Sequence, residues 1–262
     1  MSKVRRLKAS FIELLLVGRN LGLWQVLYTI LKAMVTHLRI DSKVCLRTLV
    51  LLCADIPDES IDVARDSLEP NLCFSRIVLA DLPLLKELAA DPQTWKLRLE
   101  KGDHCYVAFK ERAPVGYCWG SQGPAEFEST DVRVYWILAA RVGWDYDLFV
   151  TEEYRRQNIA NGLRAVRVAD ERSRGLHRAF RVVEYDNFRS MIGSHASNWS
   201  RAAIITSVSL GKSTFLSIRA RTQRIHSWSR EQLLVALDAD GNVQVSIQNA
   251  QAGVRGSACA KW

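Results

Sequence analysis

The chain places an apolar strand pattern, a short cationic turn and a helix pattern in direct succession over residues 148–175. The apolar run Leu148–Val150 ends the strand, and the turn EEYRRQN follows with two arginines. A turn between the carboxyl end of a strand and the amino end of a helix directs unpaired backbone N–H groups and the positive end of the helix dipole at one point. Arginine adds fork-shaped donors that match phosphate oxygens. The sequence therefore predicts an anion site, most naturally one for a phosphate or pyrophosphate.

The helix pattern after this turn has one apolar face. Four apolar residues recur at spacings of three or four and define the predicted core face: Ile159, Leu163, Val166 and Ala169. Three arginines fall outside that face and are expected to point toward solvent: Arg164, Arg167 and Arg174. Gly175 stands where the glycine that ends a helix belongs.

Strand and helix patterns alternate through the rest of the chain. Strand patterns cover residues 46–56, 73–80, 104–110, 115–121, 135–150, 178–185, 202–209 and 214–220. Helix patterns cover residues 81–102, as one or two helices, residues 159–174 and residues 187–197. This order predicts an α/β or α+β domain with a mixed sheet.

The two ends of the chain are basic and its centre is not. The net charge is +8, of which residues 1–45 carry +6 and residues 211–262 carry +4, which leaves −2 for the middle. A basic stripe on the core, typical of nucleic-acid binding, is therefore not expected. Charged and polar residues interrupt the apolar run of residues 11–38, so we interpret it as amphipathic helices rather than a membrane span. We expect residues 1–71 to be a basic helical extension with a linker and residues 221–262 a basic C-terminal extension.

The N-terminal helices have two interpretations. They pack on the core or on a second subunit, which would make the protein a homodimer, or they attach to an anionic membrane surface or partner. Six cysteines lie without any C-x-x-C pair, and the five histidines have no metal-ligand spacing. We therefore expect no disulfide framework, no metal and a reducing, cytoplasmic compartment.

Two segments carry a resemblance to a known family. Residues 150–160, VTEEYRRQNIA, resemble the acyl-CoA-binding motif of the GNAT acetyltransferase superfamily, in which a Tyr-Arg pair leads to Arg/Gln-x-x-Gly-x-Gly/Ala at a helix start. Arg155 matches the first position of this motif and Ala160 the last. Residues 182–199 resemble the second signature, a strand followed by Asn-x-x-Ser and a short helix, at Asn187 and Ser190. The resemblance covers residues 72–220 and implies a mixed, mostly antiparallel sheet flanked by helices.

The resemblance implies acetyl-CoA, or a longer acyl-CoA, as cosubstrate, and no metal. The residues expected to contact it are Leu148, Phe149, Val150, Arg155, Arg156, Gln157, Asn158, Ile159, Ala160, Asn187 and Ser190. Asn158 replaces the first glycine of the motif. Because Asn tolerates a left-handed backbone better than most residues, we expect the turn to keep its shape.

The resemblance also implies N-acetyl transfer to a primary amine of a small molecule or peptide that the sequence does not identify. A protonated amine must lose a proton before it attacks, and Asp147 and Glu184 are the candidate bases at strand ends. The catalytic tyrosine that is frequent in the family falls at Ser194 here. Ser194, His195 and Tyr185 are the candidates that protonate the leaving thiolate.

Asp145 and Asp147 form a D-x-D pair of the kind that binds metal in glycosyltransferases. Strand alternation predicts that both carboxylates lie on one face. No further acidic or histidine ligand is nearby in the sequence, so we do not expect a metal site here.

Two other classes of function stay open at this stage. The domain could bind acyl-CoA without catalysis, as a sensor or scaffold. Alternatively, the basic ends could make the chain a nucleic-acid or membrane-surface module, and binding would then weaken steeply with salt.

Overall fold

The computed structural model describes residues 44–56, 71–85, 88, 91–129, 134–196, 198–210, 213–220, 223–228 and 232–248. The predicted helical extension before residue 44, the linker at residues 57–70 and the end of the chain after residue 248 lie outside the described residues.

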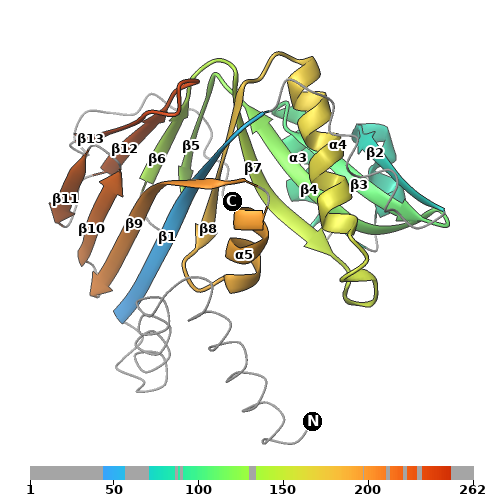
Figure 1. The fold of residues 1–262 in the computed structure, drawn as a ribbon, viewed down its shortest axis with the longest axis horizontal. Helices are drawn as coiled ribbons and strands as arrows, with labels where there is room; N and C mark the ends of the chain where they lie inside the picture. Colours follow the sequence, from blue (N-terminus) through green and yellow to red (C-terminus); the bar gives the residue numbers. More distant parts are fainter. Residues whose placement is uncertain are drawn as a thin grey trace, which may run out of the picture.

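A large sheet forms the centre of the molecule. Its strands, in chain order, are β1 Val44–Asp55, β2 Leu72–Ile77, β3 His104–Lys110, β4 Ala113–Gln122, β7 Val142–Val150, β8 Arg178–Glu184, β9 Ser200–Leu210, β10 Ser213–Ala220 and β11 Arg224–Trp228. In space the order is β11-β10-β9-β1-β8-β7-β4-β3-β2 (Figure 1). All neighbours are antiparallel except β7 and β8, which are parallel. The predicted mixed, mostly antiparallel sheet is confirmed.

A second sheet covers part of the first. Its strands are β5 Ala125–Ser129, β6 Val134–Leu138, β12 Gln232–Leu237 and β13 Val243–Gln248, in the order β13-β12-β6-β5. Trp136 of β6 packs on Trp144 of β7 with ring centroids 5.0 Å apart, inside one apolar core between the two sheets. The prediction of strand material over residues 135–150 is confirmed, but it forms two strands rather than one. A turn with Arg141 at φ 65° divides it, so β6 and β7 belong to different sheets.

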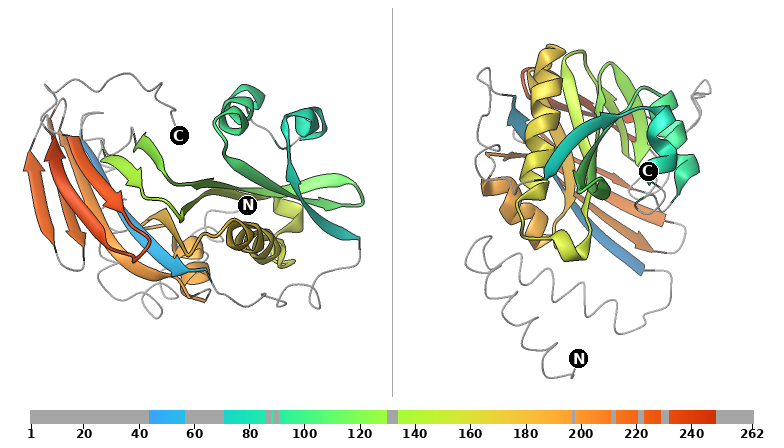
Figure 2. Two further views of the ribbon diagram at one scale, coloured as in Figure 1. Left: turned by 90° about the horizontal axis from the view of Figure 1, so that it is seen from above. Right: turned by 90° about the vertical axis from the view of Figure 1, so that its right-hand side faces the viewer.

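Helices cover both faces of the large sheet (Figure 2). The 3-10 helix η2, Leu79–Leu85, and helix α3, Pro92–Glu100, lie on one face, called the α3 face below. Helices α4, Ile159–Ser173, and α5, Phe188–Ala196, lie on the opposite face, called the α4 face. No helix in the described part of the chain is long and apolar enough to cross a membrane.

Strand β1 lies in the middle of the large sheet although it precedes the segment of residues 72–220. It pairs with β8 on one side and with β9 on the other, and Val50 and Leu51 are fully buried. Strands β11–β13 likewise belong to the two sheets. The division of the chain at residues 72 and 220 stays a prediction.

The opening between β7 and β8 is the feature that positions the candidate site. The two strands pair only from Val142 to Trp144, with Arg178 to Phe180 opposite, and then diverge. Strand β7 continues to Val150 and β8 to Glu184, so the divergence, called the splay below, leaves a gap in the sheet (Figure 1). Helices α4 and α5 flank the open end of the splay.

Candidate active site

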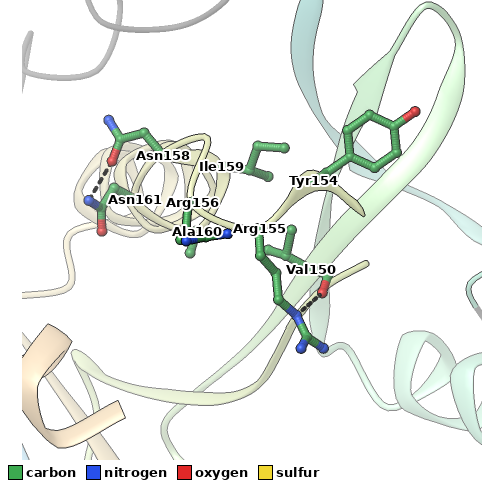
Figure 3. Close-up of a pocket in the computed structure, with 8 residues that line it drawn as sticks. All are labelled: Val150, Tyr154, Arg155, Arg156, Asn158, Ile159, Ala160 and Asn161. Atoms are coloured by element: carbon green, nitrogen blue, oxygen red, sulfur yellow. Dashed lines mark hydrogen bonds between the residues drawn. The ribbon is translucent and has the colours of Figure 1, made fainter. Parts of the chain in front are cut away.

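A pocket of about 340 Å³ opens where β7 passes into α4 (Figure 3). Its lining residues are Val150, Tyr154, Arg155, Arg156, Asn158, Ile159, Ala160 and Asn161. Six of these eight are residues that the sequence predicts as cofactor contacts. The pocket therefore lies at the predicted anion site.

The backbone of the turn is left-handed at two positions. Asn158 has φ 60° and ψ 8°, and Arg156 has φ 67°. The expectation that Asn158 adopts this conformation in place of glycine is confirmed. The side chain of Asn161 donates to the Asn158 side-chain oxygen at 2.6 Å, which fixes the start of α4 (Figure 3).

Arg155 holds the turn against the strand. Its Nε donates to the carbonyl oxygen of Val150 at 3.1 Å, so the guanidinium sits at the rim of the pocket (Figure 3). Within the described residues neither Arg155 nor Arg156 forms an ion pair. Two cations and the first N–H groups of α4 thus face one small space, which suits a bound anion.

Tight packing places α4 over the sheet. Ile159 and Leu163 are buried against β3, β4 and β7, as predicted. Gly162 lies so close to Phe74 of β2 that an added Cβ would stand 2.3 Å from its ring, so only glycine allows this approach. Gln157 accepts a hydrogen bond from Lys110 Nζ at 3.3 Å and ties the turn to β3.

The polar side of α4 differs from the prediction. Arg167 is fully buried, and Ala169, expected in the core, is exposed. Arg167 turns inward because two carboxylates receive its charge: Glu171 at 2.7 Å and Asp145 of β7 at 3.5 Å. Burial raises the pKa of Glu171, while Arg167 acts in the opposite direction. Gly175, with φ 76°, follows the end of α4 as predicted.

The buried charges continue across the start of the splay. Arg181 of β8 lies 3.5 Å from Asp145 and also donates to the hydroxyl of Ser194 on α5. Its guanidinium stacks over the ring of Trp199 at 4.2 Å. Sequence analysis missed Arg181, and the only signal for it is a charged residue inside an otherwise apolar strand pattern. These contacts join β7, β8 and α5 at the point where the strands separate.

Asp147 lies on the α3 face, opposite to Asp145. The register of β4 and β7 shifts between Tyr117 and Trp119, and Asp147, with φ 52°, is the extra residue of a β-bulge. Its Oδ2 accepts from Arg98 of α3 at 2.6 Å. The prediction that both carboxylates share a face is therefore wrong, because the bulge reverses the alternation. In the described residues no group of three or more His, Cys, Asp or Glu side chains is placed to hold a metal ion.

The residues of β7 that were predicted to contact the cofactor divide between the two faces. Leu148 and Val150 pack under α4. The side chain of Phe149 stacks on Tyr117 on the α3 face, with ring centroids 5.5 Å apart. A contact between Phe149 and a cofactor on the α4 face would thus come from its backbone.

The predicted residues around α5 have structural partners. Asn187 Oδ1 accepts from the backbone N–H of Ser190 at 3.2 Å and caps the helix. Ser194 is buried and donates to the carbonyl oxygen of Ser190. Glu184 pairs with Arg47 of β1 at 3.3 Å.

The other two candidate acids are Tyr185 and His195. Tyr185 packs against Val183 of β8 and against the apolar residues of β1 beside it. Burial raises the pKa of Tyr185. The side chain of His195 lies outside the described residues.

Comparisons with known proteins found distantly similar solved structures and a matching family model. Among solved structures, similar ones include an aminoglycoside acetyltransferase from an uncultured soil metagenomic sample in complex with sisomicin, at 17% identity, covering 49% of this chain and 88% of that one, with a TM-score of 0.38. A putative GNAT acetyltransferase from Novosphingobium aromaticivorans is similar at 16% identity over 65% and 68% of the two chains, with a TM-score of 0.46. A ribosomal-protein-alanine N-acetyltransferase from Brucella melitensis biovar Abortus is similar at 17% identity over 40% and 74%, with a TM-score of 0.29.

The search of curated proteins gave no significant match. Residues 74–192 match the sequence model of the acetyltransferase (GNAT) family. This segment contains the strand, turn and helix unit, the pocket and the splay. Residues 74–192, a little under half of the chain, therefore form a domain of the GNAT family.

Proposed function

We propose that the protein transfers an acetyl or other acyl group from acyl-CoA to a primary amine. The observation that carries the proposal is the pocket at the start of α4. It combines a left-handed turn at Asn158 with Arg155 and Arg156, which have no ion pair among the described residues, next to a gap in the sheet. The GNAT family supports acyl transfer as the chemistry.

The pyrophosphate and the pantetheine arm of acyl-CoA would bind at different places in this site. The pyrophosphate would bind the first N–H groups of α4 together with Arg155 and Arg156. The pantetheine arm would follow β7 from Val150 toward Asp145, a distance of about 16 Å at the usual rise of a strand. Among the described strands none pairs with β7 on the β8 side beyond Trp144, so the arm would run along this edge of the strand.

The acceptor then reaches the thioester through the splay, from the α3 face. Asp147 is the base that this placement favours, because it lies on the extra residue of the bulge with its side chain 38% exposed. The ammonium gives a proton to the carboxylate and becomes a neutral amine, whose nitrogen attacks the carbonyl carbon. The C–N bond forms as the C–S bond breaks, and the nitrogen gives up its second proton to solvent as the amide forms. Glu184 stays the second candidate base, since it too pairs with an arginine, Arg47, at 3.3 Å.

The leaving thiolate takes a proton at the end of the reaction. Ser194 is a poor source, because it is buried and already donates to Ser190. Tyr185 and His195 stay the predicted acids. A cytoplasmic location fits both the donor and the free thiols of Cys53 and Cys118 in the core.

Calorimetry with CoA and acetyl-CoA, combined with thiol release in the presence of an amine panel, tests the proposal. We expect binding of both ligands and amine-dependent release of CoA. Mass spectrometry of acetylated products from a cell extract would identify acceptors outside the panel. Binding without product from any source would indicate a sensor or scaffold, and the absence of CoA binding would refute the donor site itself.

A further inference from the structure

We infer that the acceptor is a primary amine with an apolar, preferably aromatic, skeleton, bound by Phe149 and Tyr117 beside Asp147. This inference rests on the proposed function and names the class of amine. With the donor on the α4 face, the acceptor approaches the thioester through the splay from the α3 face.

An aromatic pair lies at the edge of the candidate base. The rings of Phe149 and Tyr117 stack with centroids 5.5 Å apart, and Trp95 of α3 supports Tyr117 edge-on at 4.7 Å. Phe149 is 37% exposed, whereas Trp95 is buried. The pair is thus a supported aromatic surface with one ring open to an incoming ligand. Aromatic rings of this kind bind apolar carbon and, through their faces, cations.

The carboxylate of Asp147 leaves one oxygen for the ammonium group. Its Oδ2 is engaged by Arg98 at 2.6 Å, whereas its Oδ1 has only a long contact of 3.4 Å to the Tyr117 hydroxyl. Burial, and secondarily Asp147, raises the pKa of Tyr117 to about 12, so the hydroxyl stays protonated at neutral pH. An ammonium on Oδ1 therefore lies next to the Tyr117 ring. The carbon atoms attached to it would extend along the aromatic pair.

Arg98 disfavours amines that carry several charges. Its guanidinium lies 5.1 Å from the ring centroids of both Trp119 and Tyr146, and its side chain is only 12% exposed. The cation is thus held beside Asp147 in the absence of ligand. A second ammonium near it would be repelled, because like charges at short range in a partly buried site interact strongly. Polyamines and amino sugars are poor matches for this arrangement.

Other exposed apolar side chains occur on the same face. Among the described residues the large apolar side chains that are exposed are Val78, Leu79, Leu84, Leu97, Phe149 and Ile192. All except Ile192 lie on β7, on η2 or directly before it, or on α3. The acceptor side thus carries exposed apolar side chains besides the carboxylate of Asp147, which favours an amine with an apolar skeleton.

The experiment compares kcat/KM for 2-phenylethylamine, butylamine, spermidine and kanamycin at saturating acetyl-CoA, in the wild type and in Phe149→Ala. Ile192→Ala is the matched control, because Ile192 is also 37% exposed but lies on α5, on the opposite face. We expect 2-phenylethylamine to be the best substrate. We expect Phe149→Ala to lower its kcat/KM by about 10-fold, mainly through KM, with a smaller effect on butylamine. Ile192→Ala should change neither value.

The outcomes separate this inference from the proposed function. If the enzyme binds CoA and acetylates spermidine or kanamycin better than 2-phenylethylamine, the inference is wrong and the proposed function stands. Equal loss for all amines in Phe149→Ala would also overturn it, because a general effect is not recognition of an apolar skeleton. If CoA does not bind at all, the proposed function fails first.

Discussion

Asp145 and Asp147 lie two residues apart on β7, and their carboxylates project from opposite faces of the sheet. Asp145 meets Arg167 and Arg181 under the α4 face, and Asp147 meets Arg98 on the α3 face. One strand thus supplies a buried charge that joins it to α4 and β8, and an accessible carboxylate on the other side of the splay. The bulge at Asp147 makes this division of roles possible.

Arg155→Ala is expected to weaken CoA binding without unfolding the protein. The guanidinium stands at the pocket rim, and its loss removes one charge-assisted contact to phosphate, which costs about 1.5 to 3 kcal/mol, or roughly 10- to 150-fold in affinity. Calorimetry with CoA measures the effect. Arg155→Lys separates the two contributions, since it keeps the charge but loses the hydrogen bond from Nε to Val150. An unchanged Kd in Arg155→Ala would remove Arg155 from the anion site.

Asn158 is expected to tolerate glycine but not valine. Its φ of 60° is accessible to glycine, whereas a β-branched residue pays about 1 to 2 kcal/mol or more there. Asn158→Gly should therefore retain CoA binding and Asn158→Val should lose it. Asn71→Val is the control, because Asn71 has φ 73° in a turn before β2 that does not line the pocket. If Asn71→Val reduced CoA affinity as much as Asn158→Val, the effect would be one of stability alone.

The buried arginine of α4 makes a strong prediction for stability. Arg167→Met removes the cation between Asp145 and Glu171, and a buried carboxylate left without its partner costs about 3 to 5 kcal/mol. Urea unfolding at pH 7 measures the loss. Arg172→Met, on the same helix but half-buried, should change the free energy of unfolding by no more than about 0.5 kcal/mol. Equal effects of the two variants would contradict the role assigned to Arg167.

The sequence predicts features that depend on neighbouring residues and misses those that depend on distant ones. The strand, turn and helix unit and the left-handed Asn158 follow from residues close in the chain, and both are present. Arg167 is misplaced because a helical pattern counts every arginine as polar, and its partner Asp145 lies on another element. The bulge at Asp147 depends on the register with β4.

The second sheet is missed for the same reason. Strand β6 pairs in parallel with β12, from Val134 opposite Leu233 onward, about a hundred residues away in the chain. Neither segment buries its apolar side chains alone. Only the pairing of the two, and their packing on the large sheet, distinguishes β6 from a continuation into β7.

His104 is expected to make the protein less stable in mild acid. Burial, with Arg174 and Arg76 as further causes, lowers its pKa from 6.5 to about 4, and its Nδ1 lies 2.7 Å from the Arg76 guanidinium, which only the neutral ring accepts. The unfolded chain takes up the proton first as pH falls. The contribution of His104 to the free energy of unfolding is therefore fully present above pH 6.5 and declines between pH 6.5 and pH 4. Below pH 4 this residue causes no further loss of stability.

His104→Gln tests this dependence. Urea unfolding at pH 8, pH 5 and pH 4 should show a shallower decline in the variant than in the wild type. His104 is half-exposed, so solvent screening reduces the size of its effect on the free energy of unfolding. The measurement therefore compares the direction in which the pH dependence changes. Parallel declines in the two proteins would show that His104 does not cause the acid sensitivity.

The final prediction concerns the basic N-terminal region and β1. Removal of residues 1–43, which carry most of the excess positive charge, is expected to leave CoA binding largely intact, because the pocket is built from β7 and the start of α4. Solubility, assembly or acceptor use should change instead, since an amphipathic basic segment needs an apolar surface to cover its buried face. Removal of residues 1–56 also deletes β1 and should prevent folding. Val50 and Leu51 are fully buried there, and β8 and β9 would lose their shared partner.

Sedimentation and calorimetry on the two fragments measure both effects. We expect residues 44–262 to sediment as a defined species that binds CoA, and residues 57–262 to aggregate, because exposed strand edges pair with other chains. A folded, monodisperse fragment of residues 44–262 that no longer binds CoA would show that the N-terminal region shapes the cofactor site. The pocket between Val150 and Asn161 would then be only one part of that site.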